Sequence, residues 1–210
     1  MPIVTRLREL GAAGVAVELD GRPWRTLPAG VVVRAGVLTG RELDRPALRE
    51  VRRELRRAEA LDVALGALAR RDLSRSELLE RLRRRGVPAR AAVEALGGLE
   101  HFGMVDEVRL AERRAEALAG RGHGDEAIRG DLARRGLAPD MIEEALGALA
   151  PEVERAREVV AVRGATPSTA RFLARRGFSE ETIDASLHAG SDERYDRDAS
   201  SDISPAREHF

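Results

Sequence analysis

The sequence predicts an all-α protein of three stacked tri-helical repeats, preceded by a small N-terminal region with a β-hairpin and a helix. Two observations predict this fold: a helix-rich composition, and a segment of Leu, Arg-Arg and Gly that occurs three times. The 210 residues are 43% hydrophobic and 34% charged, which is typical of globular proteins. We expect an N-terminal region over 1–57, repeats over 58–104, 105–150 and 151–190, of which the third is abbreviated, and a disordered acidic tail over 191–210.

Residues 15–27 have the pattern of a β-hairpin. Apolar residues alternate with smaller or polar ones from Val15 to Leu19, and Asp20-Gly21 is a strong signal for a two-residue turn. Pro23 has no N–H to donate to a neighbouring strand. We therefore expect the second strand of the hairpin to lie at an edge.

A short helical turn is predicted over residues 29–34, and a long helix over 45–71. Asp44 is a suitable N-cap, and Pro46 falls in the first turn, where its missing N–H costs nothing. This helix could also be broken around residues 57–60. Its large apolar residues are expected on one face: Leu48, Val51, Leu55, Leu61, Leu65 and Leu68.

The repeats are defined by a shared segment, RLRRRG at 81–86, DLARRG at 131–136 and FLARRG at 172–177. In each copy a Leu lies four residues before the Gly, and an apolar residue follows the Gly directly. We expect the Gly to end a helix with positive φ, and the apolar residue to pack back on that helix. Another helix precedes each segment, over about 58–71, 106–120 and 152–163, and a third follows it.

Side chains that carry catalysis or bind metals are scarce. The absence of Cys excludes disulfides and thiol nucleophiles, and the absence of Lys excludes a Walker lysine and Schiff-base chemistry. Ser74 is expected to cap a helix, and the Gly-rich stretch 120–124 to connect two helices. We expect no catalytic residue, cofactor or metal site, because the histidines share no helix face: His101, His123, His188 and His209.

The charges balance overall but not along the chain. There are 36 basic and 36 acidic residues, whereas residues 1–57 carry 12 Arg against 7 acids, a net charge of +5. A protein that coats bare duplex DNA is normally clearly basic, so we do not expect bare nucleic acid alone to be the partner. No signal peptide or membrane span is predicted.

Arginines of the repeated segments are the candidate binding residues for a filament or nucleic acid: Arg81, Arg83, Arg84, Arg85, Arg134, Arg135, Arg175 and Arg176. Two interpretations remain open. The arginines either complement helix C-terminal dipoles, or lie along one surface of the stacked repeats that meets phosphates or an acidic groove. Base stacking is disfavoured, because the repeats offer few aromatic residues: Phe102, Phe172 and Phe178.

At these residues the sequence resembles the RecX family of regulatory proteins, the modulators of the RecA recombinase. SRSELLERLRRRGV at 74–87 resembles the first-module signature, and FGMVDE at 102–107 follows the family's G-[aromatic]-[aliphatic]-D-[DE] pattern. RRGL at 134–137 and FLARRGF at 172–178 resemble the second and third modules. Met104 and Leu110 depart from the family, which usually has aromatic residues there.

The resemblance implies a curved helical body that lodges in the groove of the RecA–DNA filament and inhibits recombination, ATP turnover and co-protease activity. It thereby implies a role in DNA repair and the SOS response. It also implies no enzyme activity, and a core position for Phe102, Phe172 and Phe178. We further expect a cytoplasmic monomer that reaches DNA through the filament or directly. Alternatives are a direct nucleic-acid-binding helical module, a purely structural interaction repeat and, last, an enzyme.

Overall fold

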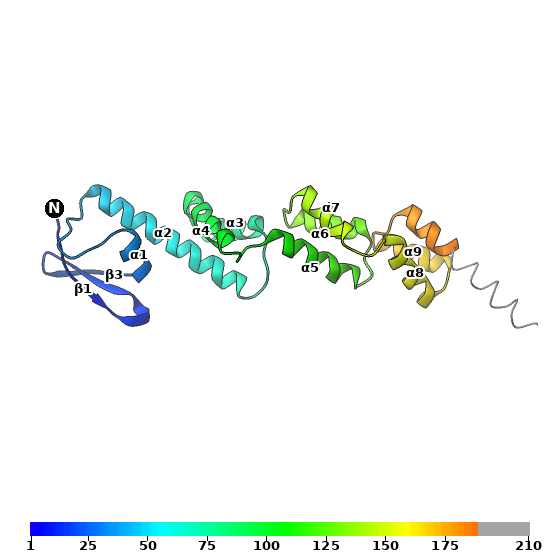
Figure 1. Ribbon diagram of the computed structural model, residues 1–210, viewed down its shortest axis with the longest axis horizontal. Coiled ribbons are helices and arrows are strands. Elements are labelled where there is room, and N and C mark those ends of the chain that lie inside the picture. Colours follow the sequence, from blue (N-terminus) through cyan, green and yellow to red (C-terminus); the bar gives the residue numbers. More distant parts are fainter. Residues whose placement is uncertain (189–210) are drawn as a thin grey trace, which may run out of the picture. The chain divides into compact units, whose positions relative to one another are not determined.

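The computed structural model describes residues 1–188, which are mostly helical with one small N-terminal sheet (Figure 1). The chain divides into two compact units, Met1–Asp106 and a second unit that begins at Glu107. The tail expected over 191–210 lies outside the described residues, as does His209. Within residues 1–188, no helix is both long enough and apolar enough to cross a membrane.

The first unit begins with a three-stranded antiparallel sheet of β1 (Val4–Glu9), β2 (Val15–Leu19) and β3 (Arg22–Leu27). A short 3-10 turn, η1 (Gly11–Ala13), joins β1 to β2. The hairpin is confirmed, and Pro23 lies on an edge strand because β2 is central. The prediction missed β1, which pairs with β2 along its length.

Helix α2 (Arg45–Leu68) continues without a break through residues 57–60. It begins at the predicted cap, where Asp44 Oδ1 accepts a hydrogen bond from the Ala47 N–H at 2.7 Å. The sheet and α1 (Ala29–Arg34) lie at its N-terminal end, and α3 (Arg75–Arg84) and α4 (Ala89–His101) at its C-terminal end (Figure 1). One helix therefore serves two hydrophobic cores.

The face of α2 that packs on α4 consists of small residues. Ala60, Ala64 and Ala67 are buried in this core, whereas Leu65 is 42% exposed. The predicted leucine face is therefore wrong at Leu65. Alanines allow the two helix backbones to approach closely, so the buried side of α2 is set by small residues rather than by large ones.

Each repeated segment ends its helix in a Schellman turn, as its spacing predicted. Gly86, Gly136 and Gly177 have φ values of 73°, 78° and 79°. The N–H of the next residue donates to the Leu carbonyl four residues before the Gly, at 3.1, 3.4 and 3.2 Å. Both residues of each pair are buried: Leu82 with Val87, Leu132 with Leu137, and Leu173 with Phe178.

The second unit contains two repeats. The first of them comprises α5 (Glu107–Ala119), α6 (Asp125–Arg134) and α7 (Pro139–Gly147). The next comprises α8 (Glu152–Arg163), α9 (Pro167–Arg175) and a helix over 180–188. The buried residues of each repeat form a separate cluster.

The turn that ends α9 lies against the start of α6. The N–H groups of Gly124 and Glu126 donate to the carbonyls of Arg176 and Gly177, at 2.9 and 3.1 Å. A Cβ atom on Gly177 would lie 2.6 Å from the backbone nitrogen of Ala127. Glycine at 177 is therefore required for a close approach between repeats as well as for its φ.

Candidate functional site

The candidate arginines lie where three helices end. Arg84, Arg134 and Arg175 are the last helical residues of α3, α6 and α9, and the arginine that follows each one is the C-cap. The carbonyl end of a helix is partially negative, so a guanidinium there is electrostatically favourable. Every copy of the segment thus places two arginines at a helix C-terminus. The burial and the ion pairs of each arginine show whether the fold itself uses it or leaves it open to a partner.

In the first repeat the cluster lines a groove of about 380 Å³ along α3. Its lining residues are Arg71, Leu73, Glu77, Glu80, Arg81, Arg84 and Arg85. Arg71 pairs with Glu77 at 3.4 Å, whereas Arg81 and Arg85 form no ion pair with any residue of the described chain. Four guanidinium groups against two carboxylates make this groove suited to an anionic partner.

Glu80 holds the other two arginines of this cluster on the exposed side of α3. It accepts hydrogen bonds from Arg83 at 2.7 Å and from Arg84 at 2.8 Å. These bonds lower the pKa of Glu80 to about 2. Glu80 therefore stays ionised and keeps Arg83 and Arg84 near each other, with both guanidinium groups mostly open to solvent.

In the second repeat the carboxylate that contacts the arginines is that of Asp131. It accepts two hydrogen bonds from Arg114, at 2.8 and 3.1 Å, and lies 3.4 Å from Arg135. The bond from Arg114 is the main cause that lowers the pKa of Asp131. The side chain of Arg135 is only 17% exposed, whereas that of Arg134 is 74% exposed. Arg135 thus has a structural role, and Arg134 remains open to solvent.

In the third repeat Arg176 also contacts other residues of the fold. Its Nη1 donates to the Arg121 carbonyl at 3.2 Å and lies 3.2 Å from His123 Nε2, while its guanidinium stacks over the Phe172 ring. Burial and the charge of Arg176 lower the pKa of His123. Arg175, in contrast, is exposed.

The structure therefore separates the eight candidate arginines by their exposure. Arg83, Arg84, Arg85, Arg134 and Arg175 are exposed, and Arg81, Arg135 and Arg176 are partly buried. The residue directly before the glycine is exposed in the first repeat but half-buried in the other two. The alignment of all three arginine clusters along one surface stays a prediction, because the first cluster belongs to one compact unit and the other two belong to the second.

The expected core position of Phe102 is wrong. Its side chain is 75% exposed and stacks edge-on with His101, with 5.3 Å between the ring centroids. Phe102 is the C-cap of α4, and the turn at Gly103 directs this position to solvent. Phe178 is buried as predicted, and Phe172 is half-buried beneath guanidinium groups.

The three described histidines have unrelated surroundings. His101 contacts Phe102, His123 contacts Arg176, and His188 Nδ1 lies 2.7 Å from the Asp184 carbonyl. Within residues 1–188, no group of three or more His, Cys, Asp or Glu side chains is placed to hold a metal ion. Ser74 caps α3, accepting from the Glu77 N–H at 3.1 Å, as predicted.

Comparison with known proteins identifies related chains. Residues 60–99 match the model of the RecX first three-helix domain, and residues 106–146 match that of the RecX second three-helix domain. A regulatory protein RecX of Chromohalobacter salexigens is 37% identical over 143 residues, which are 63% of this chain and 94% of that protein. The Deinococcus radiodurans regulatory protein RecX is 34% identical over 149 residues, 66% of this chain and 70% of that protein.

Solved structures share the fold at lower sequence identity. A crystal structure of a regulatory protein RecX superimposes with a TM-score of 0.76 at 18% identity, covering 88% of this chain and 98% of that one. RecX from Lactobacillus salivarius gives a TM-score of 0.58 at 17% identity, over 65% of this chain and 97% of that one.

Proposed function

Because this chain belongs to the RecX family of regulatory proteins, we propose that it binds the RecA–DNA filament and inhibits its activities. The activities concerned are strand exchange, ATP hydrolysis and co-protease function, so the protein acts on DNA repair and the SOS response. In this proposal the protein is a cytoplasmic monomer without enzyme activity of its own.

The observation that carries this proposal is the groove along α3. Arg81 and Arg85 face it without a carboxylate partner among residues 1–188, and Arg84 adds a third guanidinium at its edge. A RecA–DNA filament offers both phosphates and protein carboxylates, and guanidinium groups bind either one in bidentate geometry. The exposed arginines of the second and third repeats, Arg134 and Arg175, provide further contacts.

The overall charge supports a mixed protein and DNA target. The chain has 36 acidic and 36 basic residues, so long-range attraction to bare DNA is weak. Local positive groups can still dock where the partner's surface is negative, because electrostatic complementarity acts over about 10 Å at ordinary salt. If several repeats each contact the filament, their contacts together would raise the affinity of the whole chain for it.

Co-sedimentation tests the binding step. Preformed RecA–DNA filaments are pelleted with increasing amounts of the purified full chain, and the bound fraction is measured. We expect saturable binding in the pellet, and much weaker binding to RecA-free DNA at the same salt concentration. Absence from the filament pellet at stoichiometric amounts would remove the proposal.

A further inference from the structure

Arginines recur along one side of the N-terminal half of α2, at Arg45, Arg49, Arg52 and Arg56. Intervals of four, three and four residues keep side chains on one side of a helix with 3.6 residues per turn. All four are exposed. We call this row the α2 arginine ridge, and its length is about 16 Å at the helical rise of about 1.5 Å per residue.

Three members of the ridge have no carboxylate partner. Within the described chain, Arg45, Arg49 and Arg52 form no ion pair, while Arg56 pairs with Glu59 at 3.0 Å. The nearby acid Glu54 points to the opposite side of the helix, where it is buried and bonds Arg34 at 2.6 Å. Three of the four cations in the ridge are therefore not neutralised by residues of the described chain.

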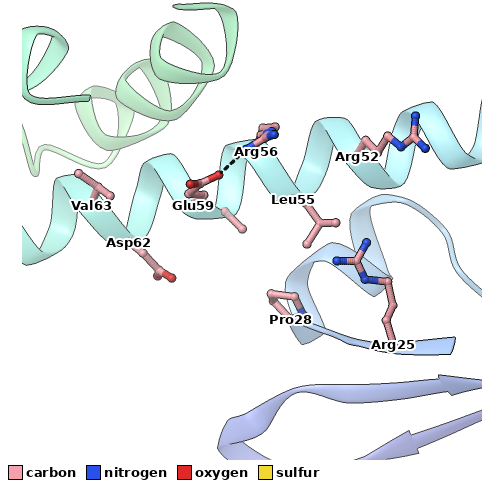
Figure 2. Close-up of a pocket in the computed structure, with 9 residues that line it drawn as sticks. Arg25, Pro28, Arg52, Leu55, Arg56, Glu59, Asp62 and Val63 are labelled. Carbon is pink, nitrogen blue, oxygen red and sulfur yellow. Dashed lines mark hydrogen bonds and ion pairs between the residues drawn. The ribbon is translucent and has the colours of Figure 1, made fainter. Parts of the chain in front are cut away.

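A groove of about 600 Å³ runs beside the ridge, between α2 and the C-terminal part of β3 with the residue that follows it, Pro28. Figure 2 shows Leu55 pointing toward Pro28, with Arg52 and Arg56 on α2 and Arg25 on the other side. Arg25 also stacks over Trp24 and has no ion pair within residues 1–188. A further cation thus faces α2 from the sheet, and Glu59 and Asp62 mark the acidic end of the groove (Figure 2).

We propose that the α2 arginine ridge, together with Arg25, is a docking surface for the phosphate backbone of DNA. This inference deepens the proposed function and rests on it for its biological setting, since it assigns direct DNA contact to the N-terminal region. The row extends past the groove at Arg45 and Arg49, so it fits a long, regularly charged polymer better than a short acidic peptide. One strand of a duplex has a phosphate for about every 3.4 Å of helix axis, so a row of cations of this length can contact more than one phosphate.

The charge distribution agrees with this assignment. Residues 1–57 carry a net charge of +5, although the whole chain is neutral. Guanidinium groups without carboxylate partners bind phosphates without first breaking an internal ion pair. The ridge lies apart from the repeated Arg-Arg-Gly segments in sequence, so the two surfaces can be altered separately.

The test measures binding of a short fluorescent DNA duplex, without recombinase, as a function of salt concentration. The variant Arg49→Gln with Arg52→Gln is compared with the wild type. We expect weaker binding, and a slope of log K against log salt that is shallower by about two units. Arg157→Gln with Arg171→Gln is the matched control, because it removes two exposed arginines from the second unit. Circular dichroism checks that both variants keep wild-type helicity.

Three outcomes would overturn the assignment. An unchanged slope in the ridge variant would mean that these arginines do not contact phosphate. Equal losses in both variants would reduce the effect to net charge. Normal binding of the duplex by the ridge variant, together with weakened binding when the same variant is co-sedimented with RecA–DNA filaments in a separate assay, would make the ridge a protein-binding surface. Because RecA is absent, failure here leaves the proposed function standing, and failure to bind filaments leaves this test intact.

Discussion

The Glu152 carboxylate accepts a hydrogen bond from the backbone N–H of Asp125, with 2.7 Å between Oε1 and nitrogen. It also accepts from the Thr182 hydroxyl at 2.7 Å and the Ser179 hydroxyl at 3.0 Å. Asp125 begins α6, and Ser179 precedes the helix that starts at residue 180. One carboxylate therefore caps helices in two successive repeats, next to Arg155, which pairs with Asp125.

Glu152→Gln should weaken the coupling between these repeats. The amide keeps one acceptor oxygen but loses the charge, so we expect the free energy of unfolding to fall by about 1–3 kcal/mol. Urea denaturation followed by circular dichroism measures the change. Glu154→Gln removes the same charge from an exposed position in the same turn and should cost less than half as much. Equal costs would show that the carboxylate of Glu152 is not an anchor.

The contribution of Glu152 should disappear in acid. Burial alone raises its pKa, but the hydrogen bonds from Asp125, Thr182 and Ser179 outweigh burial and hold the pKa below the ordinary 4.5. The unfolded state then takes up its proton first as pH falls below about 4.5, so the stabilisation present above that pH is lost. The difference in unfolding free energy between wild type and Glu152→Gln should thus be constant from pH 5 to 7 and shrink below pH 4. A difference that does not shrink at all between pH 5 and pH 3 would contradict this cause.

The two glycines Gly86 and Gly177 should differ in their tolerance of alanine. Both have positive φ, so each substitution strains the backbone by about 1 kcal/mol. At Gly86 the new Cβ meets open space, whereas at Gly177 it would collide with Ala127. We expect Gly177→Ala to lower the melting temperature clearly more than Gly86→Ala does.

Gly66 provides a control in which alanine is expected to raise stability rather than lower it. Gly66 lies inside α2 with open space around its would-be Cβ atom, so Gly66→Ala should raise stability by about 1 kcal/mol. Differential scanning calorimetry of the three variants gives the ranking. Equal melting temperatures for Gly86→Ala and Gly177→Ala would mean that the repeats do not pack as closely as described.

Arg85 and Arg135 occupy the same position in two repeats but should behave differently when changed to glutamine. Arg135→Gln loses the contact with Asp131 from a half-buried site, so we expect a stability loss of about 1 kcal/mol. Arg85→Gln changes an exposed side chain and should alter stability by less than about 0.5 kcal/mol, while weakening filament binding. Thermal denaturation and filament co-sedimentation on both variants separate the roles, and a reversed pattern would refute this division.

The sequence predicted features that depend on local spacing. The Leu-x-x-x-Gly-apolar frame predicted the Schellman turns, because each is closed by residues within six positions. Asp20-Gly21 and Ser74 with Glu77 likewise acted through near neighbours. Such signals survive in any tertiary context, so the helices of the repeats were found close to their observed ends.

Features that depend on distant partners were not predictable in the same way. β1 carries mostly exposed residues and becomes a strand by pairing with β2. Leu65 is exposed because α4 packs on a different side of α2. Arg135 is half-buried because it lies beside Asp131, which Arg114 also contacts, and no short sequence pattern predicts this arrangement. The α2 arginine ridge was not predicted from the sequence, because only the structure shows that three of its members have no acidic partner among residues 1–188.

ATP hydrolysis by preformed RecA–DNA filaments tests the central claim most directly. Purified wild-type protein and the variant Arg81→Gln with Arg85→Gln are titrated against fixed filaments, and the rate is measured. The wild type should lower the rate at amounts comparable to RecA, and the variant should need about tenfold more, a binding loss of about 1.4 kcal/mol. An unchanged rate with the wild type at stoichiometric amounts would contradict the claim that this protein inhibits the filament.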